Sequence, residues 1–323
     1  MPDQILDVDL LAFEQGDQPK RQAVVDGVMR SLSTGFVYTS HDIPVDVLDA
    51  AYDLLTRFFS LPPGTKAKYV APGSHGQTGY TGLAVETAAT SDTPDWKEML
   101  NWGREVAAGH PVRRAYPHQY AEPVLPEGDV PGITDVLMAM HERLIDLQRR
   151  FLGVIAVGLG CDQHFFDDLL IDGATLDRAI HYPPMATANG AAHVWAAEHG
   201  DINLITALPR ATTRGLQVKT VEGWVDAVAP EGHVIINTGI MLERLSNGRL
   251  PTGIHRVVAA PEEEGDRYSV VQFCHPSPWM VLSPLPSCVT TDRPCRYGSI
   301  RAGDLLERVL WEINLIEDGR RVD

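Results

Sequence analysis

The sequence predicts an α+β fold with a mostly β core: a double-stranded β-helix (jelly roll) with N-terminal helices and a long helix behind it. Two observations support this prediction. Between about residues 175 and 285, short apolar runs rich in β-branched residues alternate with turn signals, as in a double-sheet jelly roll. Before this core, apolar residues recur at helical spacing, and the longest such stretch runs from Ile133 to Leu159.

The N-terminal part alternates strands and helices. Ile5–Leu10 is predicted to be a short strand, and Arg21–Ser33 has the apolar spacing of a helix. Gly35 follows at the end of this helix, a position where glycine is favoured. Phe36–Tyr38 is predicted to be a second strand. Pro44–Ser60 is a second helix, which the prolines directly after it terminate.

A long segment rich in Gly, Thr, Ser and Ala, Ser74–Asp95, is predicted to be a loop that can include short strands. Long loops in compact domains are often functional, so both a pocket-lining segment and a plain surface loop stay open. The run Trp96–Trp102, which mixes aromatic and polar residues, follows. Its tryptophans are expected to pack in the core, as tryptophans more often do. The candidate substrate contacts in this region are Tyr80, Asn101 and Trp102. His193, in a polar loop later in the chain, is a fourth candidate.

The core strands come after a connector, Phe165–Asp168 and Ala174–Asp177, that is predicted to be helical. A segment with five prolines, Pro276–Cys295, resists regular structure, and Ala302–Ile316 is predicted to be the final helix. The predicted core strands are Arg178–Tyr182, Ile202–Leu208, Gly215–Val218, Gly232–Asn237, His255–Val258 and Tyr268–Phe273.

Length and composition indicate one globular domain over residues 1–323. Within it, residues 1–120 form an N-terminal helical, substrate-lining region, and residues 175–285 form the jelly-roll core with the metal site. The net charge of −16 argues against nucleic acid or an anionic membrane as a partner. The same charge is compatible with a cationic small-molecule substrate, but a solvated acidic surface that aids solubility explains it better. We expect a monomer.

Compartment and redox state follow from what the sequence lacks. No apolar run is long enough to span a membrane, and Met1–Gln4 lacks the basic start of a signal peptide, so we expect a cytoplasmic protein. The spacing of the four cysteines suggests neither a zinc site nor a disulfide framework. They are therefore expected to be reduced thiols without a catalytic role.

The strongest motif is His199-Gly200-Asp201, and 53 residues separate it from His255. Two imidazoles and one carboxylate can occupy one face of an octahedral metal and leave the opposite positions open, which is typical of non-heme Fe(II) oxygenases. Because side chains alternate along a strand, the outer residues of His-x-Asp point the same way at a strand end. Three other histidines are alternative candidates for metal ligands or substrate contacts: His193, His233 and His275.

A set of ordered segments resembles the isopenicillin N synthase-like branch of the Fe(II)/2-oxoglutarate-dependent oxygenases, over about Ile5 to Pro284. The matching segments are His181–Pro184, Glu198–Asp201, Gly215–Val218, Gly253–Val257 and Arg267–Ser269, with weaker matches at Gly35–Tyr38 and Asp95–Met99. The resemblance implies that His199, Asp201 and His255 hold Fe(II), that Arg267 with Ser269 binds the distal carboxylate of 2-oxoglutarate, and that Tyr182 is a third contact to it. A guanidinium suits that role because it can grip a carboxylate with two parallel hydrogen bonds.

The resemblance therefore implies an oxidoreductase that uses Fe(II), 2-oxoglutarate and O2. Such an enzyme would act on a small molecule of secondary metabolism, for example in antibiotic biosynthesis. It would abstract a hydrogen atom from this molecule, and the product would result from hydroxylation, desaturation or oxidative cyclisation. Two alternatives stay open. One is an Fe(II) oxidase on the same scaffold that needs no 2-oxoglutarate. The other is a zinc hydrolase or non-redox metal-binding protein, which would leave the Arg267/Ser269 pair unexplained.

Overall fold

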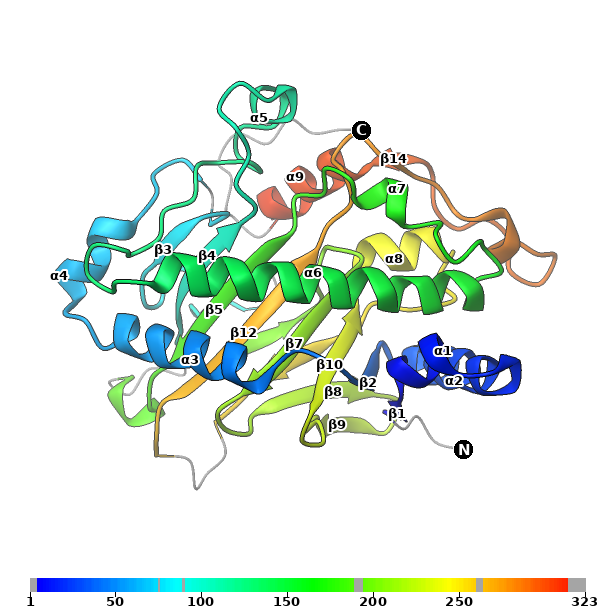
Figure 1. The fold of residues 1–323 in the computed structure, drawn as a ribbon, viewed down its shortest axis with the longest axis horizontal. Helices are drawn as coiled ribbons and strands as arrows, with labels where there is room; N and C mark the ends of the chain where they lie inside the picture. Colours follow the sequence, from blue (N-terminus) through cyan, green and yellow to red (C-terminus); the bar gives the residue numbers. More distant parts are fainter. Residues whose placement is uncertain (1–4, 75, 89–90, 189–193, 260–263, 313–323) are drawn as a thin grey trace.

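Two β-sheets form the centre of the computed structural model, which describes residues 5–74, 76–88, 91–188, 194–259 and 264–312 (Figure 1). The large sheet has the order β1 (Asp7–Val8), β2 (Phe36–Ser40), β10 (His233–Thr238), β7 (Ile205–Ala211), β12 (Arg267–Cys274), β5 (Leu176–Tyr182), β4 (Glu98–Gly103), β3 (Gly79–Thr81). The small sheet has the order β6 (Ala196–His199), β11 (His255–Val257), β8 (Leu216–Thr220), β9 (Gly223–Asp226). Neighbouring strands are antiparallel except for the β1–β2 pair.

The two sheets pack against each other through an apolar layer. Phe36 and Ile180 of the large sheet and Trp195, Leu216 and Val257 of the small sheet segment belong to one buried cluster. Because side chains alternate along a strand, the opposite face of the large sheet is free to pack against helices. This arrangement is the predicted jelly roll.

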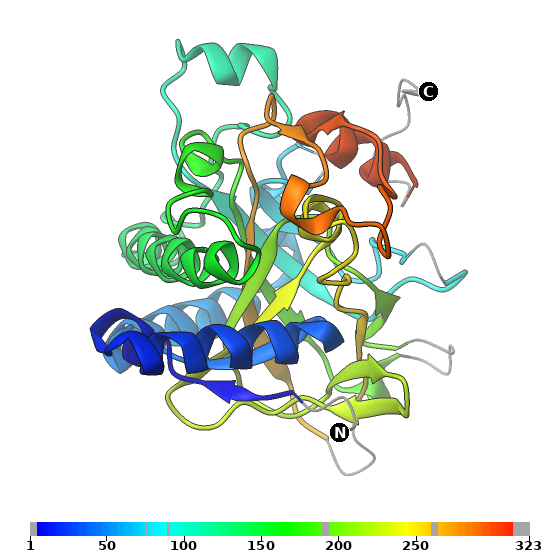
Figure 2. The same ribbon diagram turned by 90° about the vertical axis from the view of Figure 1, so that its right-hand side faces the viewer.

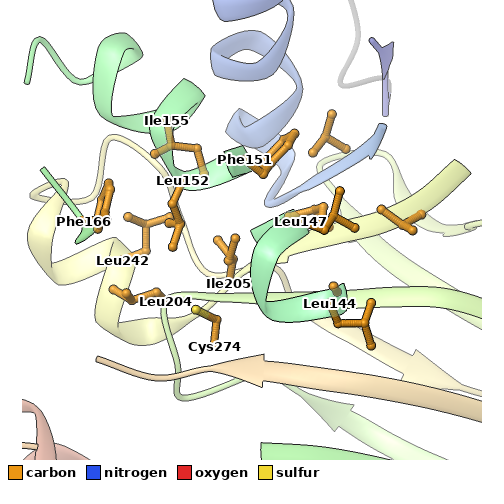
Figure 3. Close-up of a cluster of buried hydrophobic side chains, with 14 of the residues drawn as sticks. Leu144, Leu147, Phe151, Leu152, Ile155, Phe166, Leu204, Ile205, Leu242 and Cys274 are labelled. Carbon is orange, nitrogen blue, oxygen red and sulfur yellow. The ribbon is translucent and has the colours of Figure 1, made fainter. Parts of the chain in front are cut away.

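Helices cover that opposite face (Figure 1, Figure 2). The longest, α6 (Ile133–Gly158), crosses the large sheet, and α2 (Gln18–Ser31) and α3 (Val45–Phe59) pack beside it. Figure 3 shows how Leu147 and Phe151 of α6 lie over strand residues such as Ile205. The remaining helices are α1 (Leu10–Gln15), α4 (Pro63–Lys66), α5 (Pro111–Ala115), α7 (Asp167–Leu170), α8 (Ile240–Leu245) and α9 (Ala302–Glu312).

Short irregular elements complete the described chain. They are η1 (Leu32–Thr34), η2 (Ala67–Tyr69), η3 (Met185–Thr187), η4 (Pro286–Cys288) and the pair β13 (Val281–Leu282) and β14 (Ile300–Arg301). The proline-rich segment after the core is therefore irregular apart from β13 and η4. None of the helices in the described ranges is long and apolar enough to cross a membrane.

The predicted elements match the structure closely, with three corrections. The predicted strand Ile202–Leu208 begins only at Ile205, the first residue of β7. The predicted last helix is α9, and its expected final residues 313–316 lie outside the described residues.

The expected strand Ile5–Leu10 is strand only at β1, because the Asp9 side chain accepts a hydrogen bond from the Ala12 amide and caps helix α1. The expected helical connector Ala174–Asp177 is also wrong, because Ala174 and Thr175 belong to no helix or strand. Leu176 and Asp177 belong to β5, because β4 pairs with them across the sheet.

Candidate metal centre

His199, Asp201 and His255 meet at one end of the small sheet. His199 is the last residue of β6 and lies directly opposite His255, the first residue of β11, with ring centroids 4.3 Å apart. Asp201 follows β6 by two residues, and its Oδ1 lies 4.0 Å from Nε2 of His255. One ligand atom from each side chain lies within 4.8 Å of the others, so the three can share one metal ion.

Hydrogen bonds hold each of the three side chains in a ligand orientation. Nδ1 of His199 lies 2.7 Å from the Ala197 carbonyl, and Nδ1 of His255 lies 3.0 Å from the Gly253 carbonyl. A carbonyl can only accept, so both rings donate from Nδ1, and Nε2 is the nitrogen of each ring that is left for a metal.

The carboxylate of Asp201 is oriented in the same way. Its Oδ2 accepts hydrogen bonds from Thr206 Oγ1 at 2.6 Å and from Asn237 Nδ2 at 2.8 Å. These two bonds leave Oδ1, the oxygen nearer His255, as the ligand atom.

The surroundings also set the charge states that a metal needs. Burial, and then the nearby His255, lower the pKa of His199 to about 4, so this imidazole is neutral near pH 7. Burial raises the pKa of Asp201, but His255, His199 and the two hydrogen bonds hold it below its ordinary value. The donor set is therefore neutral imidazole plus carboxylate, and it is the one group of this kind found among the described residues.

An inner cavity lies between the two sheets beside the triad, and Arg267, Ser269 and Tyr182 line it. Arg267 is 1% exposed, donates from Nη1 to Ser269 Oγ at 3.2 Å, and places its guanidinium carbon 4.9 Å from the centre of the Tyr182 ring. Nε of Arg267 has no hydrogen-bond partner, and the guanidinium forms no ion pair with any described carboxylate. Because a buried unpaired cation is costly, this cavity suits a small anion such as a dicarboxylate.

An outer cavity of about 340 Å³, against about 60 Å³ for the inner one, lies on the other side of the triad. Its apolar wall is made by Leu176, Ile202, Ile240, Phe273 and the α9 residues Leu306, Val309 and Leu310. The segment Ser74–Asp95 contributes Gln77, Glu86, Thr87, Ala88 and Asp95. Of the two possibilities for this segment, the structure supports the pocket-lining one.

A buried charge cluster stands where the two cavities meet. Lys97 Nζ lies 2.9 Å from Asp95 and 3.3 Å from Glu86, and Arg178 Nη1 lies 3.5 Å from Glu86. Asp95 also accepts a hydrogen bond from the Ala197 amide of β6 at 2.9 Å, which ties the cluster to the strand that carries His199. Burial raises the pKa of Glu86, but Arg178 and Lys97 hold it below its ordinary value.

Sequence reasoning did not identify this cluster as part of the site. The available signal was an ionisable residue at an inward-facing position of a buried strand. Arg178 faces the same side of β5 as Ile180 and Tyr182, because the three are two residues apart, and all three line the inner cavity.

The four candidate substrate contacts have different locations. Tyr80 donates a hydrogen bond to Glu98 and packs edge-to-face on Phe58, away from both cavities. Trp102 is fully buried in the core on the helix side of the large sheet. Asn101 lines neither cavity, but its Oδ1 accepts a hydrogen bond from Arg178 Nε at 2.8 Å. His193 lies outside the described residues.

Two of the competing histidines can also be placed. His275 lines the outer cavity, where burial lowers its pKa to about 4. His233 is paired with Asp7 at 3.2 Å and is absent from the residues that line either cavity. Neither joins the group of three ligands.

Comparison with known proteins gives consistent matches over both parts of the chain. Residues 5–127 match the family described as non-haem dioxygenase in morphine synthesis N-terminal, and residues 176–276 match the 2OG-Fe(II) oxygenase superfamily. Kihadalactone A synthase LFS of Citrus sinensis is 30% identical over 287 residues, covering 85% of this chain and 83% of that protein. The 2-oxoglutarate-Fe(II) type oxidoreductase hxnY of Emericella nidulans is 28% identical, covering 84% and 78%.

Solved structures agree with the sequence relatives. A 2OG-Fe(II) oxygenase family protein from Caulobacter crescentus superposes with a TM-score of 0.84 and is 33% identical, covering 96% of this chain and 99% of that one. A full-length Neurospora crassa protein in complex with alpha-KG and thymine superposes with a TM-score of 0.83 and is 26% identical, covering 95% and 96%.

Proposed function

The chain belongs to the 2OG-Fe(II) oxygenase superfamily, and we propose that His199, Asp201 and His255 are the side chains that hold its iron. It is an Fe(II)- and 2-oxoglutarate-dependent dioxygenase. The bound iron supplies the activation of O2, with 2-oxoglutarate as the electron source that becomes succinate and CO2, and with cleavage of a substrate C–H bond as the outcome. The two imidazoles fixed through Nδ1 and the oriented carboxylate described above support this assignment.

The observation that carries the cosubstrate assignment is the buried, unpaired guanidinium of Arg267. In our proposal, Arg267 and Ser269 donate hydrogen bonds to the distal carboxylate of 2-oxoglutarate, and Tyr182 forms the wall beside it. The inner cavity also reaches His199, Asp201 and His255. A dicarboxylate anchored at Arg267 can therefore extend toward the metal ligands without entering the outer cavity.

We further propose that the outer cavity holds a small-molecule substrate. Leu306, Val309 and Leu310 of α9 cover it and exclude water, while the opposite wall contains His199 and Asp201. This placement suits hydrogen abstraction followed by hydroxylation, desaturation or oxidative cyclisation. The plant and fungal relatives support a role in secondary metabolism; antibiotic biosynthesis stays a prediction without such support.

The same proposal treats residues 1–323 as one monomeric oxygenase domain. Strands β2, β3 and β4 of the N-terminal region pair within the same large sheet as the core strands. The segment Gln77–Asp95 supplies outer-cavity residues, so residues 1–120 and 175–285 contribute jointly to one site.

Anaerobic titration of the Fe(II)-loaded protein with 2-oxoglutarate tests these assignments. We expect the weak visible charge-transfer band of an iron–2-oxoglutarate complex, and its loss in His255→Ala. His233→Ala is the matched control, because His233 lies against Asp7 and should leave the band intact. Iron binding without a band would contradict the cosubstrate assignment, and Arg267 would then be tested as an anchor for the substrate's own carboxylate.

A further inference from the structure

Gly200, between the two ligands of the His199-Gly200-Asp201 motif, has no room for a side chain. A Cβ atom at this position would lie 2.6 Å from Cγ2 of Thr252 and 3.1 Å from Cδ1 of Ile254. The φ angle of Gly200 is not positive, so its backbone conformation alone does not require glycine. The close approach of Thr252 is therefore the feature that requires glycine between the two ligands.

Thr252 cannot move away from Gly200 without breaking hydrogen bonds to one carboxylate oxygen. Its amide N and its Oγ1 both donate to Oε2 of Glu243, at 2.8 Å and 2.6 Å. The following amide, Gly253 N, donates to the Thr238 carbonyl at 2.9 Å. Because Oγ1 and Cγ2 branch from the same Cβ, fixing Oγ1 also fixes the methyl group, which is thus held against Gly200.

Glu243 is itself held in place from two directions. Its Oε1 accepts a hydrogen bond from the Tyr297 hydroxyl at 2.5 Å, so the C-terminal segment fixes the second oxygen. Its helix, α8, begins beside the metal ligands, where the Ile240 amide donates to the Asp201 carbonyl at 2.9 Å. Burial raises the pKa of Glu243, but the hydrogen bonds from Thr252 and Tyr297 hold it below its ordinary value. The side chain is therefore a carboxylate that can accept all three bonds.

Thr252 stands between the two halves of the candidate metal centre. On one side its methyl group lies against the turn that carries His199 and Asp201. On the other side its chain leads directly to His255, whose Nδ1 lies 3.0 Å from the Gly253 carbonyl. A displacement of Thr252 would therefore change the position of the first two ligands relative to the third.

We propose that Thr252 and Glu243 are positioning residues of the metal centre. Glu243 fixes Thr252, and Thr252 sets how closely the turn after β6 approaches the strand end that carries His255. Both act through the ligands, and metal affinity depends on them because ligand atoms must be held within about 0.5 Å of the productive geometry. This inference rests on the proposed role of His199, Asp201 and His255 as the iron ligands.

The first test is titration of the metal-free protein with Mn(II) in a double-mutant cycle. Gly200→Ala places a methyl group against Thr252 Cγ2 and should weaken Mn(II) binding about tenfold or more. Thr252→Ser removes Cγ2 but keeps the hydroxyl for Glu243. In the Thr252→Ser background, Gly200→Ala should cost less than about threefold, because only the flexible end of Ile254 has to shift. Gly109→Ala is the matched control, since a Cβ there would meet no atom within 4 Å.

The second test removes the carboxylate without adding an atom to the ligand turn. Glu243→Leu deletes the acceptor of Thr252 and Tyr297, keeps a side chain of similar size, and should weaken Mn(II) binding about tenfold or more. Thermal unfolding of each metal-free variant verifies the fold. A merely destabilising substitution would lower the melting temperature and leave the Mn(II) affinity of the folded protein unchanged.

Three outcomes would overturn the inference: no loss of Mn(II) affinity in Gly200→Ala, an equal loss in both backgrounds, or an unchanged affinity in folded Glu243→Leu. Failure of the unmodified protein to bind Mn(II), or unchanged binding in His255→Ala, is a different result. It would contradict the proposed ligand set, so the two failures are distinguishable.

Discussion

His199 and His255 face each other directly across the antiparallel pair β6–β11, with their ring centroids 4.3 Å apart. Each ring is fixed through Nδ1 by the backbone carbonyl two residues earlier in the chain. The candidate metal site thus forms where two paired strands each have a terminal histidine that is held by a backbone carbonyl. Asp201 adds the carboxylate from the turn after β6.

Removing the hydroxyl that orients Asp201 should weaken metal binding without removing a ligand. Thr206→Val deletes the 2.6 Å hydrogen bond to Asp201 Oδ2 and keeps the shape of the side chain. Loss of such an outer partner typically costs about 10- to 100-fold in metal affinity. Titration with Mn(II) as the probe measures this effect. Thr213→Val, in a partly exposed loop, is the control, and an unchanged affinity in Thr206→Val would contradict the orienting role.

Arg267→Ala should weaken 2-oxoglutarate binding by about 100-fold or more, because it removes charge-assisted hydrogen bonds to a buried carboxylate. It should not destabilise the ligand-free protein, since it also removes an unpaired buried cation. Thermal unfolding checks both effects at once. 2-Oxoglutarate should raise the melting temperature of the unmodified protein and leave that of Arg267→Ala unchanged. An equal rise in both proteins would show that the cosubstrate binds elsewhere.

Lys97 and Lys219 allow a matched comparison of how much a buried and an exposed lysine contribute to the free energy of unfolding. Lys97→Met leaves the buried Asp95 and Glu86 carboxylates without their shared cation, which should cost about 3–5 kcal/mol of unfolding free energy. Lys219→Met breaks an exposed ion pair with Glu198 and should cost less than about 1 kcal/mol. Denaturant unfolding at pH 7 compares them. Similar small losses in both variants would mean that the charge cluster is more hydrated than its burial indicates.

The stability of the metal-free protein should fall as the pH is lowered from about 6.5 toward 4. His199 and His275 have pKa values of about 4 in the folded chain, because burial disfavours their charged forms, against 6.5 when unfolded. Between these values the unfolded chain binds more protons, so stability increases with pH.

His275→Asn isolates one contribution to this pH dependence. It should reduce the slope of unfolding free energy against pH by up to about 1.4 kcal/mol per pH unit near pH 5, the value for one proton. Denaturant unfolding in the presence of a chelator measures the slope at several pH values between 4 and 7. If the slope stays the same in His275→Asn, this histidine is not neutral in the folded state.

Local patterns in the chain were enough to predict the order and type of most elements and the positions of the three candidate ligands. Helical spacing placed α6 within one residue of its observed end, and alternation placed the His-x-Asp motif at the end of a strand. These features follow from periodicity, which the chain carries in any window of about ten to twenty residues. The Arg267/Ser269 pair was assigned from the family resemblance, and strand alternation agrees with it, because residues two apart on one strand face the same side.

Which residues meet at the outer cavity could be seen only in the folded chain. Glu86, Asp95 and Lys97 lie in the loop that precedes β4, and Arg178 lies on β5, so their contacts depend on how that loop packs against the sheet. Folding also turned Tyr80 toward Glu98 on the far side of the sheet and away from the outer cavity. The physical reason is strand register. A shift of one residue reverses the face of every side chain, and the register is fixed by packing across the whole sheet rather than by any local pattern.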